Sequence, residues 1–272
     1  MFKFLHAADL HLDSPLRGLD RYEGAPVDAI RQATRRAVEN LVELAIAERV
    51  AFVVIAGDVY DGDWPDYNTG LFFARQMAKL GEAGIAVYLI SGNHDAESVI
   101  TRSLMLPENV AMLRTDRPES RRHQATNCVL HGQGFATRAV TADLSANYPA
   151  AERGSFNIGI LHTSAGGSSE HETYAPCTIE GLRRLEYDYW ALGHIHLQQK
   201  LCDNGSLIAF SGNTQGRHIR ETGPKGCLLV TVDGGVPSAE FRPLDVFRWE
   251  RCATSATGCD EPEDVLDLVR DD

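Results

Sequence analysis

The chain has 272 residues, of which 43% are hydrophobic and 24% are charged, an ordinary globular composition that excludes the disordered and collagen-like classes. Its length suits one large α/β domain, or one domain plus the start of another. The formal net charge of −12 argues against a broad nucleic-acid-binding surface. It does not exclude nucleic acid, because bound metal ions would add positive charge where a phosphate docks.

The first third of the chain alternates apolar strands with amphipathic helices. Residues 2–8 have the pattern of a buried strand, and apolar residues at i, i+3 and i+4 predict a helix over residues 27–48. Further along, residues 51–56 predict a strand, residues 68–83 a second helix and residues 85–90 another strand. This alternation implies βαβ units and a parallel sheet that is covered on both faces.

The second half of the chain is richer in strands. The predicted strands are 127–131, 156–162, 187–193, 205–210, 226–233 and 238–243. From residue 253 onward the sequence becomes acidic and polar, with a short helix-like stretch at 265–269. We therefore predict that residues 1–250 form the main α/β domain and that residues 251–272 are a tail or the truncated start of an accessory domain.

The sequence also indicates a cellular location. The six cysteines form no CxxC pair, which is typical of reduced thiols. The apolar run at the N-terminus meets an acid at Asp9, which makes it too short for a signal peptide. No stretch approaches the roughly 18 apolar residues of a membrane span. We predict a cytoplasmic protein with no membrane association.

Residues that bind metals or transfer protons follow several of the predicted strands. They are Asp9, His11, Asp58, Asn93, His94, His162, His194 and His196. Ligands of α/β sheets bind beyond the carboxyl ends of the strands, where these residues fall. The i, i+2 spacing of Asp9 and His11 places both side chains on one face of an extended segment. Together these side chains suit manganese, iron or zinc, and a set of hydrogen-bonded polar loop residues is the alternative interpretation.

Five segments resemble, in order and rough spacing, the successive motifs of the calcineurin-like metallophosphoesterases. They are Asp9-Leu10-His11, Gly57-Asp58-Val59-Tyr60-Asp61, Gly92-Asn93-His94-Asp95, Leu161-His162 and Gly193-His194-Ile195-His196. The resemblance implies an α/β fold in which two mixed β-sheets, flanked by helices, form a four-layer αββα sandwich. It also implies a hydrolase with two divalent metal ions, for which we expect manganese, with iron or zinc as alternatives.

The same resemblance implies a role for each residue. One metal ion would be held by Asp9, His11, Asp58 and His196. The second would be held by Asp58, Asn93, His162 and His194, so that Asp58 bridges the two ions. Two cations roughly 3.5–4 Å apart clamp a phosphate and lower the pKa of a shared water. His94 matches the non-ligand histidine of the family, which stabilises phosphate oxygens or protonates the leaving oxygen.

Asp61 has a separate expectation. An acid at this position orients the catalytic histidine in the phosphoprotein phosphatase branch, whereas a histidine commonly stands there in archaeal and eukaryotic double-strand-break nucleases. We predict an Asp61–His94 dyad, because a carboxylate that orients an imidazole fixes its tautomer. Asp95 is the competing partner for His94, and a role for Asp61 as an ordinary surface-loop acid is the alternative.

Two further features bear on the substrate. Protein phosphatases of the superfamily carry an arginine directly after the acid, whereas Gly62 follows Asp61 here. The opening FLHAADLHLDSPL, and the segment from Ser211 to Gly226, resemble bacterial DNA repair exonucleases of the SbcD and YhaO type. From this resemblance we predict a DNA exonuclease or endonuclease that acts in DNA repair. Its predicted substrate-binding residues are Arg217, Arg220 and Lys225.

The resemblance also suggests partners, and other functions stay open. Nucleases of this group usually work with a SbcC-like coiled-coil ATPase that docks on a C-terminal extension, for which this chain has little room. The oligomeric state is open, with a homodimer as one option. A small-molecule phosphodiesterase or phosphatase, for example one acting on cyclic nucleotides, is the main alternative function. A non-catalytic binding module is the other, which the intact ligand set disfavours.

Overall fold

The computed structural model describes residues 1–14, 29–30, 32–62, 67–97, 105–165, 174–251, 253–259 and 261–271. The start of the helix predicted at residue 27 lies outside these ranges. Among the helices within them, none combines the length and the apolar character needed to cross a membrane.

The first sheet contains six strands in the order β12-β11-β1-β2-β3-β4. Their bounds are β1 Phe2–Ala7, β2 Phe52–Ala56, β3 Ala86–Ile90, β4 Val110–Met112, β11 Gly226–Asp233 and β12 Val236–Pro243. Strands β1 to β4 run parallel, as the βαβ pattern predicts. The hairpin of β11 and β12 joins the free edge of β1 in antiparallel orientation, which makes the sheet mixed.

The second sheet also has six strands, in the order β5-β6-β7-β8-β10-β9. Their bounds are β5 Glu119–His123, β6 Cys128–Gly132, β7 Phe156–His162, β8 Tyr189–Gly193, β9 Gln199–Cys202 and β10 Leu207–Phe210. The four inner strands are parallel, and the edge strands β5 and β9 are antiparallel to their neighbours.

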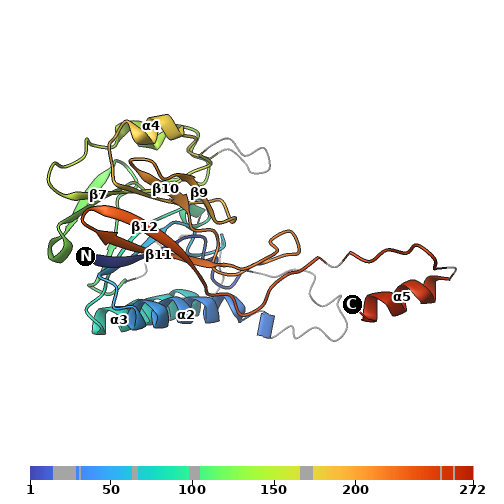
Figure 1. Cartoon of the computed structure of the whole chain (residues 1–272). Coiled ribbons are helices and arrows are strands. Elements are labelled where there is room, and N and C mark those ends of the chain that lie inside the picture. Colours follow the sequence, from blue (N-terminus) through green and yellow to red (C-terminus); the bar gives the residue numbers. More distant parts are fainter. Residues whose placement is uncertain are drawn as a thin grey trace.

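The molecule has four layers, and an apolar core lies at each of the three interfaces between neighbouring layers. Helices α2 (Ala33–Ala47) and α3 (Tyr67–Glu82) pack on the outer face of the first sheet, where Leu5 points. Phe4, the neighbour of Leu5 on β1, lies in the core between the sheets, as alternation along a strand requires. The third core joins the outer face of the second sheet to helix α4 (Ile179–Arg183). Figure 1 shows α2 and α3 at one side of the sandwich and α4 at the other.

The predicted αββα sandwich is confirmed, and the six strands predicted in the second half are all present. The sequence did not predict β4, β5, β9 or α4. These elements are three to five residues long. Strand β5 has the sequence ESRRH, which has no apolar alternation to reveal it. Short edge strands form through long-range pairing, so local periodicity carries little information about them.

The C-terminal residues include one more helix, α5 (Pro262–Asp271). It contains the helix-like stretch predicted at 265–269. Figure 1 shows α5 apart from the two sheets, at the end of an extended segment. Its apolar side chains Leu266, Leu268 and Val269 are exposed. The division into residues 1–250 and a separate tail stays a prediction.

Candidate metal centre

The predicted metal ligands come together at the carboxyl ends of the parallel strands. Among the described residues, three groups have ligand atoms within 4.8 Å of one another: Asp9, His11 and His196; His11, Asp58 and His94; and Asp9, Asp58 and His162. These side chains lie at the end of β7 or just beyond the ends of β1, β2, β3 and β8, so both sheets contribute to the cluster. Residues up to 187 positions apart in the sequence therefore share one site.

The backbone turns sharply at several of these residues. The φ angle is 53° at Asp9, 43° at His11, 52° at Asp58 and 96° at His194. Positive φ is uncommon for residues other than glycine and costs on the order of 1–3 kcal/mol where it occurs. Hydrogen bonds between the loops hold this conformation, since Asp9 N donates to Gly57 O at 3.0 Å and His11 N to Asp58 O at 3.1 Å. Strain of this kind concentrates at functional sites.

Glycines beside the ligands give the side chains room to converge. A Cβ atom on Gly92 would lie 2.2 Å from Oδ1 of Asp58. A Cβ atom on Gly57, whose φ is +94°, would lie 2.5 Å from Nδ1 of His162. Neither contact is possible for a real side chain, which explains why each of these motifs begins with glycine.

The first half of the centre contains Asp9, His11 and His196. Nε2 of His11 lies 3.1 Å from Nε2 of His196, and Asp9 Oδ1 lies 3.9 Å and 3.8 Å from these two nitrogens. Two ring nitrogens approach this closely only with a proton or a cation between them. Imidazole nitrogen and carboxylate oxygen are good ligands for divalent transition metals, so this group fits a metal ion.

The second half contains His162, Asn93 and Asp58. His162 Nδ1 donates to the carbonyl of Ala56 at 2.9 Å, so Nε2 faces Asn93 Oδ1 at 2.9 Å and Asp58 Oδ2 at 3.4 Å. Burial by itself would lower the pKa of His162, but the carboxylates of Asp58 and Asp9 outweigh it and raise this pKa to about 9. The second half of the centre thus favours positive charge, and its nitrogen and oxygen atoms fit a second divalent cation.

Asp58 lies between the two halves. Its Oδ2 is 3.8 Å from His11 Nε2 on one side and 3.4 Å from His162 Nε2 on the other. Its Oδ1 accepts a hydrogen bond from the backbone N–H of His94 at 3.0 Å. Burial would raise the pKa of Asp58, but the charges of His162 and His11 outweigh this and lower it. An ionised carboxylate in this position matches the predicted bridging ligand.

The predicted contact between His94 and Asp61 is present. His94 Nδ1 lies 3.0 Å from Asp61 Oδ1, and 30% of the His94 side chain is exposed. Asp61 also accepts a hydrogen bond from Ser14 Oγ at 2.6 Å. Asp95 has a different environment, because its carboxylate accepts the backbone N–H groups of Val59, Tyr60 and Gly92. Of the two carboxylates, Asp61 therefore contacts His94, and Asp95 joins two of the loops that carry predicted ligands.

His194 is placed beside the second half of the centre. It belongs to none of the three groups of ligand atoms that the described residues form. Its ring centroid lies 5.2 Å from that of His162 and 5.4 Å from that of Tyr174. Its backbone N–H donates to both carboxylate oxygens of Asp9, at 3.0 and 3.2 Å. Its role as a metal ligand stays a prediction.

The three predicted substrate-binding residues have different environments. Arg217 reaches the site, with its guanidinium 3.3 Å from Asp61 Oδ2 and 15% of its side chain exposed. Arg220 is exposed at the surface. Lys225 is only 5% exposed, and burial lowers its pKa against the raising effect of Glu221 and Asp245. Lys225 is thus poorly placed to meet a substrate phosphate, and Arg217 is the best placed of the three.

Sequence reasoning assigned no role to three residues that line the site. Ser14 donates to Asp61, Tyr174 packs on His194, and Glu221 lies 2.6 Å from His196 Nδ1. Ser14 and Glu221 had a signal in the sequence, because each belongs to a segment that resembles the DNA repair exonucleases. The contacts themselves join distant segments and could not be read from the local pattern.

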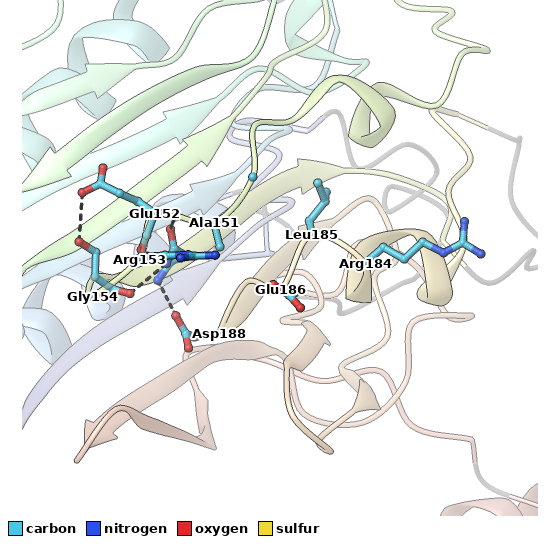
Figure 2. Close-up of a pocket in the computed structure, with 11 residues that line it drawn as sticks. Ala151, Glu152, Arg153, Gly154, Arg184, Leu185, Glu186 and Asp188 are labelled. Carbon is cyan, nitrogen blue, oxygen red and sulfur yellow. Dashed lines mark hydrogen bonds between the residues drawn. The ribbon is translucent and has the colours of Figure 1, made fainter.

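A cavity of about 450 Å³ lies at the other end of the second sheet (Figure 2). Its lining comes from the loops that lead into β7 and β8, whereas the metal ligands follow these strands. Arg153 and Arg184 line it together with Glu152, Glu186 and Asp188. Because basic and acidic side chains are mixed there, the lining favours no particular ligand. The chemistry-bearing residues lie elsewhere, at the carboxyl ends of the strands.

Comparison with known proteins gives matches in sequence and in structure. Residues 2–198 match the family model of the calcineurin-like phosphoesterases. The uncharacterized metallophosphoesterase YhaO of Bacillus subtilis (strain 168) is 35% identical over 271 residues, which cover 98% of this chain and 66% of that protein. The chain thus spans just under two thirds of the length of this relative.

Solved structures with little sequence identity share the fold. GAP50, the anchor in the inner membrane complex of Plasmodium, superposes with a TM-score of 0.55 at 14% identity, over 91% of this chain and 86% of that one. TT1561 of Thermus thermophilus has a TM-score of 0.50 at 12% identity, over 88% of this chain and 98% of that one. At such identities the likeness concerns the fold alone.

Proposed function

This chain belongs to the calcineurin-like phosphoesterase family, and on this premise we propose that it is a two-metal phosphodiesterase whose substrate is DNA. Family membership makes it a metal-dependent phosphoester hydrolase with a dinuclear metal centre. The observation that carries the proposal is the position of Asp58, an ionised carboxylate between two groups of buried ligand atoms.

The residues around Asp58 have two functions in this proposal, metal binding and proton transfer. Asp9, His11, Asp58 and His196 would hold one ion, and Asp58, Asn93, His162 and His194 the other. When bound, two such cations neutralise the charge of a phosphate and lower the pKa of a water between them. His94 Nδ1 donates a hydrogen bond to the Asp61 carboxylate, which leaves Nε2 to meet a phosphate oxygen or the leaving group. Burial opposes ionisation of Asp61, but the nearby rings of His11 and His94 and the charge of Arg217 outweigh it and lower its pKa.

The basic side chains near the centre favour a diester. A monoester dianion carries charge on one more oxygen than a diester monoanion and needs more cationic partners. Of the basic residues predicted to bind substrate, Arg217 alone contacts the site, through Asp61. Arg220, three residues further on, is exposed and could meet a neighbouring phosphate of a nucleic acid strand.

Several finer features belong to the same proposal. The mixed nitrogen and oxygen ligands suit manganese, with iron or zinc as alternatives. Action in DNA repair in the cytoplasm, together with a SbcC-like coiled-coil ATPase, follows from the resemblance to SbcD- and YhaO-type nucleases. Residues 251–272 would then belong to a tail or an accessory domain that is separate from the catalytic domain.

Hydrolysis of three substrates tests the proposal. With manganese added, we expect cleavage of single-stranded DNA and of bis-p-nitrophenyl phosphate, and slower cleavage of p-nitrophenyl phosphate. Colorimetric release of nitrophenol and gel analysis of labelled DNA provide the measurements. Faster cleavage of p-nitrophenyl phosphate than of the bis ester would favour the alternative, a small-molecule phosphatase.

Charge-neutralising variants sharpen the test of the DNA substrate. The double variant Arg217→Gln/Arg220→Gln should weaken DNA binding and lower the slope of log K against log salt by up to about 0.9 for each lost phosphate contact. The control Arg153→Gln/Arg184→Gln removes the same charge at the opposite end of the second sheet (Figure 2) and should leave the slope unchanged. Equal slopes for both double variants would argue against these contacts.

A further inference from the structure

Glu221 lies beside the metal centre, in the loop that leads into β11 and beyond the part of the chain that matches the family model. The residue is 8% exposed. Both of its carboxylate oxygens have partners, and these partners come from two different parts of the site. A buried carboxylate with this many contacts needs an explanation, because its burial has an electrostatic cost unless it is paired.

One oxygen faces the first half of the centre. Glu221 Oε1 lies 2.6 Å from His196 Nδ1. Burial would raise the pKa of Glu221, but the hydrogen bond and charge of His196 and the charge of Arg217 outweigh it and lower this pKa. A carboxylate oxygen accepts hydrogen bonds, so Nδ1 of His196 is the donor in this contact. The other ring nitrogen, Nε2, then faces Asp9 Oδ1 at 3.8 Å and His11 Nε2 at 3.1 Å.

The other oxygen fixes the loop that carries Arg217. Glu221 Oε2 accepts the backbone N–H of Arg217 at 2.6 Å and the side-chain amide of Asn213 at 3.0 Å. The guanidinium of Arg217 then reaches Asp61 Oδ2 at 3.3 Å. One carboxylate therefore holds a predicted metal ligand and a predicted phosphate-binding residue in a fixed relation.

We propose that Glu221 is a positioning residue, whose carboxylate holds His196 with Nε2 directed at the first metal ion and holds the backbone of Arg217 beside the site. The inference rests on the proposed role of His196 as a ligand. A carboxylate that orients a metal-bound histidine fixes the tautomer and raises the basicity of the ligand. Glutamine cannot replace it, because an amide has one acceptor oxygen, whereas the two sides of Glu221 both face donors.

Manganese affinity of the whole chain, measured by isothermal titration calorimetry and by metal analysis after dialysis, tests this role. Wild type should bind two ions. Glu221→Gln should bind one of them roughly 10- to 100-fold more weakly and keep the other. The control Glu240→Gln changes an exposed glutamate on β12 and should bind both ions like wild type.

A double-mutant cycle separates positioning from a general effect on the fold. In the His196→Ala background, Glu221→Gln should cause no further loss of manganese affinity, since the ring that it orients is gone. The metal-free Glu221→Gln protein should keep the circular dichroism spectrum and the single cooperative melting transition of wild type, although its melting temperature falls. The inference is overturned if Glu221→Gln binds both ions normally, or if its loss is the same with and without His196. Wild type that binds no ions would overturn the proposed function, and this inference with it.

Discussion

Replacement of His94 by alanine is expected to lower kcat by about 10²- to 10⁴-fold while both metal ions stay bound. The reason is its position: Nδ1 contacts Asp61 at 3.0 Å, which leaves Nε2 for the substrate, and 30% of the side chain is exposed. The hydrogen bond and charge of Asp61 also outweigh the effect of burial and raise the pKa of His94, which suits a residue that donates a proton or stabilises negative charge.

Two assays check this result. Turnover of bis-p-nitrophenyl phosphate gives kcat, and metal analysis gives the number of ions per chain. The geometry also allows a competing outcome, because a ligand atom of His94 lies within 4.8 Å of those of His11 and Asp58. Loss of an ion in His94→Ala would show that His94 is a ligand. Asp61→Asn provides a matched comparison, and its effect should be small in the His94→Ala background, since it acts through that ring.

Replacement of Asp58 by asparagine is expected to abolish hydrolysis and to weaken binding of both ions. Asparagine keeps the shape of the side chain but removes the charge that lies between His11 and His162. We expect a loss of affinity above about 100-fold, the upper end for a residue that merely orients a ligand. His162→Ala should instead deplete one ion, because its Nε2 faces the second half of the centre only.

Manganese titration by calorimetry, with metal analysis after dialysis, distinguishes these two variants. Asp58→Asn should fail to retain either ion after dialysis, whereas His162→Ala should retain one. Circular dichroism of the metal-free proteins controls for folding. An Asp58→Asn protein that holds two ions with wild-type affinity would remove Asp58 from the bridging position.

Much of the site could be predicted because its residues follow strands. An apolar run that ends at Asp9, and another that ends just before Asp58, place two carboxylates at the same edge of a parallel sheet without any knowledge of loop structure. The Asp61–His94 dyad was predicted from the family resemblance instead, and in the structure the two side chains lie 3.0 Å apart, beyond the adjacent strands β2 and β3.

The remaining features depend on contacts that local patterns do not encode. The antiparallel pairing of β1 with β11 joins segments more than 200 residues apart, so periodicity in either strand does not reveal it. Lysine is usually found at the surface, but Lys225 is buried beside Glu221 and Asp245. The contact of Glu221 with His196 depends on how the loop before β11 folds over the end of β8. Such positions are determined by tertiary packing and require the structure.

The central claim is that two metal ions share Asp58. Anomalous scattering from crystals of the manganese-loaded protein tests it most directly. We predict two manganese peaks in each chain, one beside Asp9, His11 and His196 and the other beside Asn93 and His162, with Asp58 in contact with both. A single peak that does not contact Asp58, or no peak among these residues, would contradict this account.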